Sequence, residues 1–358
     1  MARDGIDLYE KLLEREEATL SKLGLKSRDS KGRKIPEKPD RVRTAFQRDR
    51  DRIIHCKAFR RLKHKTQVFL APEGDHFRTR LTHALETTQI ARGIGRALGL
   101  NEDLTEAIGL GHDLGHTPFG HAGEKILNDW CIKHGIESGF QHHIQSVRVV
   151  EVLENDGAGL NLTFETVEGI LKHTKGPGDY SVVLEPDDTL HWEGRVVKIS
   201  DRIAYVNHDL QDAVEAGLVK NEDIPQAFIK ILGATNRERI SSMVIDIIST
   251  TMKEGRLALS PEMESTINDL KDFLFERVYY HKEIRKHDDA IRRCLEGLLD
   301  IFNSEKDVYE KYLKVWEEEK AVRTRHLVDY VAGMTDRYAV SVAQELMIPS
   351  PWPLHFQV

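Results

Sequence analysis

Apolar residues that recur every three or four positions restrict the fold of this chain more than any other feature, because that spacing puts them on one face of an α-helix. In residues 79–98 the inward positions follow at steps of four, three, four and three: His83, Thr87, Ile90, Ile94 and Ala97. Similar patterns predict helices at about 7–23, 43–64, 102–113, 120–133, 142–155, 163–173, 195–217, 285–303 and 305–331. Alternating strand patterns are nearly absent; only the span 174–193 fits a short hairpin or a lid loop. The sequence therefore predicts an all-α protein.

The 358 residues are enough for one large domain or two, and 40% hydrophobic with 31% charged residues is ordinary for a soluble protein. No apolar run reaches the roughly 18 residues of a membrane helix, and the N-terminus does not resemble a signal peptide. We therefore expect no membrane partner. The three cysteines (Cys56, Cys131 and Cys294) are scattered and form no C-x-x-C motif, which argues against a disulfide framework or a zinc ribbon. A reducing, cytoplasmic location fits this pattern.

A basic block lies at residues 41–65 of an otherwise acidic chain. It holds ten Lys or Arg residues and two Asp, whereas the net charge of the whole chain is −7. Such a block suggests a polyanionic ligand, either a nucleotide or a nucleic acid. The alternative is a solvated helical face whose charges form local ion pairs.

An adjacent histidine and aspartate, His112 and Asp113, end the apolar pattern of residues 102–113. Successive helical residues diverge by about 100°, so both side chains can reach one ion only where the backbone leaves the helix, as Gly115 and Pro118 favour. Taken singly, His83 could be a hydrogen-bonded core residue and the dipeptide could arise by chance. Asp201 lies among apolar residues of the 195–217 helix, however, where a carboxylate needs a cation or several donors. Together the four residues form a possible metal site with mixed nitrogen and oxygen ligands.

Several motifs around these residues narrow the interpretation. They are Arg60-Arg61-Leu62 with Gln67, Arg80-Leu81-Thr82-His83, the stretch from His112 to His121, Phe140 to Ser146, and Asp201 to Asp209. In combination they resemble the deoxynucleoside triphosphate triphosphohydrolases, the dGTPase-like branch of the HD-domain phosphohydrolases. The resemblance covers about residues 40–215. His143 departs from it, because related proteins often carry another polar residue there.

The resemblance implies three regions: an N-terminal helix and linker at 1–40, an HD phosphohydrolase core at 41–218, and a helical C-terminal region at 219–358 packed on that core. It also implies an activity in which water attacks the α-phosphorus of a dNTP, releasing deoxynucleoside and inorganic tripolyphosphate. Neither the preferred base nor activation by a second dNTP is implied. The metal ligands would be His83, His112, Asp113 and Asp201. This donor set suits Mn²⁺, Mg²⁺, Fe²⁺, Ni²⁺ or Co²⁺ better than a dedicated zinc site.

The remaining site residues follow from the same motifs. His121 and Glu124 would form a catalytic dyad, because a carboxylate three residues along a helix can orient an imidazole and raise its pKa. His142 would be a second catalytic histidine, although it could instead be a surface residue beside His143. The substrate-binding candidates are Arg80 and Arg202 for phosphate, His116 for the turn or phosphate, Gln67 for the sugar, Tyr205 under the sugar and Asp209 at the 3′-hydroxyl. Plain helix packing is the alternative for Tyr205.

Two other functions stay open. One is an HD phosphohydrolase that acts on other nucleotides; the other is a nucleic-acid-binding regulator with a vestigial metal site. Single-stranded DNA could also bind as an allosteric input to the enzyme. The resemblance further implies a homo-oligomer, a tetramer or a hexamer.

Overall fold

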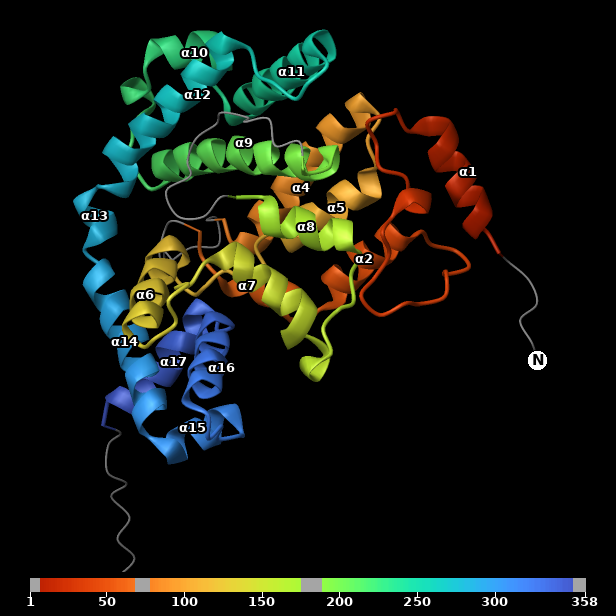
Figure 1. Ribbon diagram of the computed structural model, residues 1–358. Helices are drawn as coiled ribbons and strands as arrows, with labels where there is room; N and C mark the ends of the chain where they lie inside the picture. Colours follow the sequence, from red (N-terminus) through yellow and green to blue (C-terminus); the bar gives the residue numbers. More distant parts are fainter. Residues whose placement is uncertain (1–6, 68–77, 175–188, 350–358) are drawn as a thin grey trace, which may run out of the picture.

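The computed structural model describes residues 7–67, 78–174 and 189–349 (Figure 1). Its α-helices, in chain order, are α1 (Tyr9–Thr19), α2 (Ala45–His55), α3 (Lys57–Arg61), α4 (Arg80–Leu98), α5 (Glu102–Gly111), α6 (Gly120–Lys133), α7 (His142–Arg148), α8 (Phe164–Lys172), α9 (Trp192–Glu215), α10 (Gln226–Leu232), α11 (Asn236–Glu254), α12 (Pro261–Leu274), α13 (Lys282–Arg285), α14 (Asp288–Ser304), α15 (Lys306–Leu313), α16 (Lys320–Ala332) and α17 (Asp336–Met347). Two π-helical turns, η3 (Val149–Leu153) and η6 (Phe275–Tyr279), extend α7 and α12. Short 3₁₀ turns are η1 (Ser27–Asp29), η2 (Leu62–His64), η4 (Asn155–Gly157) and η5 (Asn221–Asp223).

The all-α prediction is confirmed. Within the described ranges, extended pairing is limited to two isolated bridges, Arg33 with Thr163 and Thr66 with Thr79. No helix in those ranges is long and apolar enough to cross a membrane. The possible hairpin or lid at 174–193 falls mainly on residues 175–188, which lie outside the described residues.

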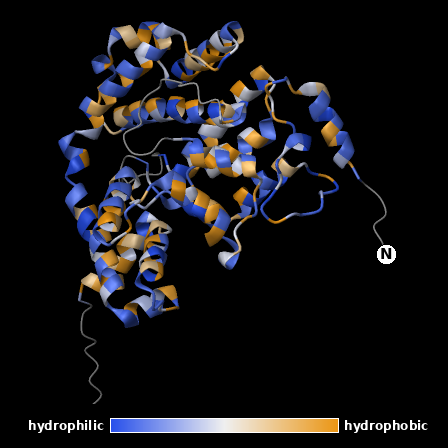
Figure 2. Cartoon of the chain, in the orientation of Figure 1, coloured by the Kyte–Doolittle hydropathy of each residue, from blue (hydrophilic) through white to orange (hydrophobic). Residues whose placement is uncertain are grey.

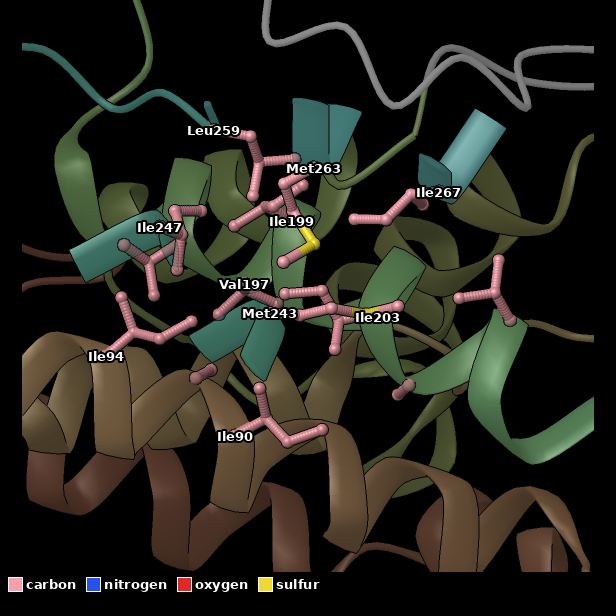
Figure 3. Packing of buried hydrophobic residues seen from close by; sticks show 14 of the residues in the cluster. Ile90, Ile94, Val197, Ile199, Ile203, Met243, Ile247, Leu259, Met263 and Ile267 are labelled. Atoms are coloured by element: carbon pink, nitrogen blue, oxygen red, sulfur yellow. The ribbon is translucent and has the colours of Figure 1, made fainter. Parts of the chain in front are cut away.

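Helix α9 runs through the middle of the fold, with α4 and α5 on one side and α11 and α12 on the other (Figure 1). Aliphatic side chains fill the space between them (Figure 3), including Ile90 and Ile94 of α4, Ile203 of α9, Met243 of α11 and Ile267 of α12, all 2% exposed or less. Burying one such side chain contributes about 1.5–3 kcal/mol. This packing holds α4, α5 and α9 together, and the candidate metal ligands lie on or next to these three helices.

A second apolar cluster joins α6 to the C-terminal helices α14, α16 and α17. Trp130 of α6 also donates its indole N–H to Asp300 of α14, at 2.9 Å. Figure 2 shows how hydrophobic and hydrophilic residues share each of these helices, as amphipathic elements require. The three-region division at 1–40, 41–218 and 219–358 stays a prediction.

Two predicted helices are interrupted. The 43–64 pattern breaks at Cys56, whose extended backbone (φ −72°, ψ 158°) separates α2 from α3. The prediction of one helix at 305–331 is wrong: α15 ends at Leu313, and Lys314 after it has a left-handed backbone (φ 71°). There Trp316 packs edge-on against Tyr309, with the Arg323 guanidinium 4.3 Å from its ring centre, so tertiary contacts outweigh the helical pattern.

One inward position of the 79–98 pattern is also wrong. Ala97 is exposed, and the last buried residue of α4 is Leu98, after which Gly99 ends the helix with a positive φ of 68°.

Four arginines of the basic block form ion pairs with nearby acids. Arg43 pairs with Asp51 at 2.9 Å, Arg50 pairs with Asp103 at 3.1 Å, and both Arg48 and Arg52 pair with Glu37. Lys65 is 2% exposed, and its ammonium donates to the carbonyls of His116 and Ala332. These contacts favour local ion pairing over an open polyanion surface.

Candidate metal centre and active site

The four predicted metal ligands converge from three parts of the fold. His83 lies on α4, His112 and Asp113 follow α5, and Asp201 lies on α9. The Nε2 atom of His83 is 2.9 Å from Oδ1 of Asp201, and Nε2 of His112 is 3.6 Å from the same oxygen and 3.7 Å from Oδ1 of Asp113. Ligand atoms about 2.0–2.2 Å from one ion are separated by distances of this size.

A close backbone approach shapes the turn after α5. The Gly115 N–H donates to the Ser146 hydroxyl at 2.9 Å, and that hydroxyl donates to the His112 carbonyl at 2.7 Å. A Cβ atom added at Gly115 would lie only 2.1 Å from the Ser146 nitrogen. Glycine is therefore required here so that α7 can lie directly against the turn that carries His112 and Asp113.

Hydrogen bonds orient both histidine ligands. The Nδ1 atom of His112 lies 2.6 Å from the Gly109 carbonyl, so it carries the proton and Nε2 keeps its lone pair. That Nε2 atom is buried and has no hydrogen-bond partner in the described part of the chain, which fits a metal ligand. Nδ1 of His83 lies 3.2 Å from Nδ1 of His208, which leaves the Nε2 atom of His83 facing Asp201. A histidine that binds a metal ion commonly makes such a hydrogen bond with its other ring nitrogen, which fixes the tautomer and the orientation of the ring.

Both carboxylates stay ionised although they are buried. Burial raises the pKa of Asp113, but the Arg80 guanidinium, 2.7 Å away, and the nearby histidines hold that pKa well below its ordinary value. Burial likewise opposes ionisation of Asp201, but its hydrogen bond to His83 lowers its pKa overall. Two negative carboxylates therefore lie at the candidate centre, and such a pair could hold a divalent cation.

Glu124 of α6 organises a second group of histidines. Its Oε1 atom lies 2.8 Å from both the backbone nitrogen and Nδ1 of His142, and its Oε2 atom lies 3.4 Å from Nδ1 of His121. Burial raises the pKa of Glu124, but the charge of His142 and the hydrogen bonds from both histidines lower it overall. The side chain of His121 is 46% exposed, so its other nitrogen is accessible to a substrate.

Buried polar atoms without hydrogen-bond partners gather around Arg80, next to the candidate centre. Nε and Nη2 of Arg80, Oε1 of Gln67 and both ring nitrogens of His116 are buried and make no hydrogen bond within the described residues. Burial and the Arg80 charge hold the pKa of His116 well below its ordinary value, so its ring is neutral. Buried donors and acceptors without partners are costly, which indicates that a polar ligand completes them.

The sugar candidates lie along α9. Tyr205 stacks on Tyr279 of η6 with ring centres 6.0 Å apart, and Asp209 accepts a hydrogen bond from the Tyr279 hydroxyl. Burial raises the pKa of Asp209 to about 7. Asp209 is therefore held by the C-terminal region, a contact that the sequence did not predict.

One cavity gathers most of the predicted residues. Its lining includes these ten of them: Gln67, Arg80, His83, Asp113, His116, His121, His142, Asp201, Arg202 and Tyr205. His112, Glu124 and Asp209 are not among its lining residues.

Two further lining residues, His173 and Lys271, were missed by the sequence analysis. His173 follows α8, at the end of the 163–173 helical pattern, which by itself does not mark a functional residue. Lys271 lies on α12, where no motif was recognised.

Sequence comparisons find similar proteins over most of the chain. An HD domain profile matches residues 80–206, and a phosphohydrolase-associated domain profile matches residues 257–345. The chain is 51% identical over 333 residues to a deoxyguanosinetriphosphate triphosphohydrolase-like protein of Caldanaerobacter subterraneus, covering 93% of this chain and 94% of that protein. Proteins of the same description from Desulfatibacillum aliphaticivorans and Clostridium perfringens are each 44% identical, covering 96% and 97% of this chain and 99% and 98% of theirs. A solved hypothetical protein of Aquifex aeolicus superposes with a TM-score of only 0.40 at 18% identity, over 82% of this chain and 67% of that one, which supports no argument.

Proposed function

The chain belongs to the HD-domain family of deoxyguanosinetriphosphate triphosphohydrolase-like proteins and is a metal-dependent phosphohydrolase, and we propose that its substrate is a deoxynucleoside triphosphate. Hydrolysis would yield the deoxynucleoside and tripolyphosphate. The observation that carries this proposal is one cavity lined by three of the four proposed metal ligands, His83, Asp113 and Asp201, next to the unpaired buried donors of Arg80. A group with several negative phosphate oxygens fits both.

His83, His112, Asp113 and Asp201 would hold the divalent cation. When bound, it would supply Lewis-acid polarisation of the phosphorus and a lower pKa for water. Because the donor set is two imidazoles and two carboxylates, we propose Mn²⁺, Mg²⁺, Fe²⁺, Ni²⁺ or Co²⁺.

Arg80 and Arg202 would bind the triphosphate, with His116 beside them. The two free guanidinium nitrogens of Arg80 supply charge that does not depend on pH, while its third nitrogen stays on Asp113. His116, being neutral, can donate one hydrogen bond without adding charge. Lys271 lines the same cavity and would extend the cationic surface.

His121 would transfer the proton. Water attacks the α-phosphorus as the bond from phosphorus to the 5′ oxygen breaks, and that oxygen must gain a proton. Glu124 orients His121 through Nδ1, so the opposite nitrogen can deliver it. His142, whose Nδ1 atom contacts the same Glu124 carboxylate, would be the second catalytic histidine.

Gln67, Tyr205 and Asp209 would bind the deoxyribose. The ring of Tyr205, backed by Tyr279, offers a flat surface that excludes a 2′-hydroxyl, and Asp209 lies one turn further along α9 for the 3′-hydroxyl. Gln67 lines the cavity with an unpaired amide oxygen.

Product analysis tests the proposal. The protein is incubated with each dNTP and Mn²⁺ or Mg²⁺, and the products are separated by ion-exchange chromatography. We expect tripolyphosphate and deoxynucleoside in equal amounts; pyrophosphate or single phosphate would reject the mechanism. His112→Ala and Asp201→Ala should abolish turnover while the circular dichroism spectrum stays unchanged, and full activity in either would reject the site.

A homo-oligomer, a tetramer or hexamer, is proposed from the family alone, as is a cytoplasmic location. Single-stranded DNA binding is less supported, because Arg43, Arg48, Arg50 and Arg52 are paired with acids. If binding occurs, its affinity should fall steeply with salt. No binding at low salt would remove DNA as a partner.

A further inference from the structure

A row of polar side chains leads from the candidate metal centre toward the surface of α4. Asp201 and His208 lie seven residues apart on α9, which puts them on the same side of that helix. His83 and Glu86 lie three residues apart on α4 and likewise share a side. We propose that Glu86, acting through His208, sets the tautomer and the orientation of His83 and so determines how tightly the centre holds its cation. This inference rests on the proposed metal site, and it does not depend on which nucleotide is hydrolysed.

The imidazoles of His83 and His208 contact each other through like atoms. Nδ1 of His83 lies 3.2 Å from Nδ1 of His208, so one of these nitrogens carries a proton and the other accepts it. Both residues are buried, at 3% and 1% exposure, so water does not compete for this contact. A neutral imidazole carries a single ring proton, and the Nε2 lone pair of His83 is therefore available to a cation only when the proton lies on its Nδ1.

Glu86 decides between the two arrangements. Nε2 of His208 is buried and makes no hydrogen bond within the described residues, and Oε2 of Glu86 lies 3.3 Å from it. With the His208 proton on Nδ1, the lone pair on Nε2 would face a carboxylate, and the two would repel each other. With the proton on Nε2, the carboxylate attracts it, and Nδ1 accepts from His83. The Glu86 side chain is 41% exposed and has room to turn toward that proton.

Arg78 holds Glu86 beside His208. Its Nε atom donates to Oε2 of Glu86 at 3.0 Å, and its other nitrogens donate to Asp212 at 2.5 Å and to Gln211 at 2.8 Å, both on α9. The guanidinium thus fixes the carboxylate against the helix that carries His208. Glu86 and His208 are positioning residues, because their contacts end at His83, and the loss of such a partner typically weakens metal binding 10–100-fold.

The affinity of Glu86 variants for a cation tests the proposal. The full-length protein is stripped with a chelator and titrated with Mn²⁺ by isothermal titration calorimetry, without any nucleotide. Glu86→Ala should raise the Kd about tenfold. Glu86→Asp keeps the charge but is too short to reach His208 and should raise the Kd as much. Glu86→Gln loses the charge but keeps an acceptor oxygen and should stay within about threefold of the unmodified protein. The control, Gln89→Ala on the exposed face of α4, should leave the Kd unchanged.

The tautomer gives a second readout in the unmodified protein. With isotopically labelled histidine and Mg²⁺ bound, long-range proton–nitrogen NMR should show the His208 proton on Nε2, and the signal that disappears in His208→Gln identifies the residue. A proton on Nδ1 of His208 would overturn the proposal. So would a Kd that stays normal in Glu86→Asp and rises in Glu86→Gln, since only the charge of Glu86 would then act.

Neither readout uses turnover. A protein that binds Mn²⁺ as expected but releases no tripolyphosphate would contradict the proposed reaction and leave this inference standing. A protein that binds no Mn²⁺ would contradict the proposed metal site and this inference together.

Discussion

The carboxylate of Asp336, the first residue of α17, should contribute several kcal/mol to the free energy of unfolding, although Asp336 lies far along the chain from the site residues. Its Oδ2 atom accepts from the backbone N–H and the hydroxyl of Thr66, at 3.0 and 2.6 Å, and its Oδ1 atom accepts from the Phe119 N–H at 3.0 Å. Phe119 has a left-handed backbone (φ 60°), which costs a non-glycine residue about 1 kcal/mol. The carboxylate therefore fixes the strained turn that leads to His121.

Asp336→Ala removes all three hydrogen bonds and leaves the buried Phe119 N–H without a partner. Hydrogen bonds to a charged group contribute about 1.5–3 kcal/mol each, and the Thr66 groups are partly accessible to water. If the hydrogen bond to the Phe119 N–H contributes its full value and the two to Thr66 contribute only part of theirs, the loss in the free energy of unfolding is about 3–5 kcal/mol.

Urea denaturation followed by circular dichroism, with chelator present throughout, measures this loss. Glu345→Ala is the matched control: it removes an acid from the same helix whose ion pair with Lys311 is exposed, so the midpoint should not move. Hydrogen exchange at residues 117–121 should speed up only in Asp336→Ala. A loss below about 1 kcal/mol, or unchanged exchange at that turn, would refute the reasoning.

Three further predictions concern stability. Gly115→Ala should lower the free energy of unfolding by about 3 kcal/mol or more, because the added Cβ would clash with backbone atoms. The control, Gly93→Ala, adds a Cβ with nothing within 4 Å on an exposed face of α4 and should raise the free energy of unfolding by up to about 1 kcal/mol. Equal effects of the two substitutions in thermal melts would contradict the close approach at Gly115. Burial lowers the pKa of Lys65 to about 7, so between pH 7 and its unfolded value of 10.5 the unfolded chain holds more protons and stability rises with pH. Relative to Lys65→Met, the protein should therefore gain about 2 kcal/mol from pH 7 to pH 9 in urea titrations, and parallel pH profiles would disprove the shift. Mn²⁺ at about 100 times its Kd should raise the free energy of unfolding of the stripped protein by about 2.7 kcal/mol, and Asp201→Asn should lose this contribution; a stabilisation that survives in full would place the ion elsewhere.

The candidate metal ligands could be selected from the sequence because local patterns, weak when taken singly, combine into one set. His83 falls on an inward helical position, and Asp201 lies among apolar residues where a carboxylate needs a partner. Both are now seen within 2.9 Å of each other. The assignment of these residues to a metal stays a prediction, but their convergence was foreseen.

Other contacts left no local signal. His173 lies at the end of an ordinary amphipathic helix, and only the packing of α8 and α7 brings it 3.3 Å from His142. Tyr279 reaches Asp209 from seventy positions away. The helix ends before Lys314 because Trp316 packs against Tyr309 and Arg323, and the helical pattern of the sequence does not predict these contacts.

By itself, the sequence determined the all-α class, most helix positions and the residues gathered around His112 and Asp113, since helical periodicity and the cost of burying a charge act over a few neighbouring residues. Only the tertiary structure decided that the basic block pairs with local acids, that Lys65 and Asp336 tie the C-terminal helices to the active-site turn, and that His173 joins the site. These outcomes depend on which helix faces pack together. That choice is made by the whole apolar core, so no short stretch of sequence records it.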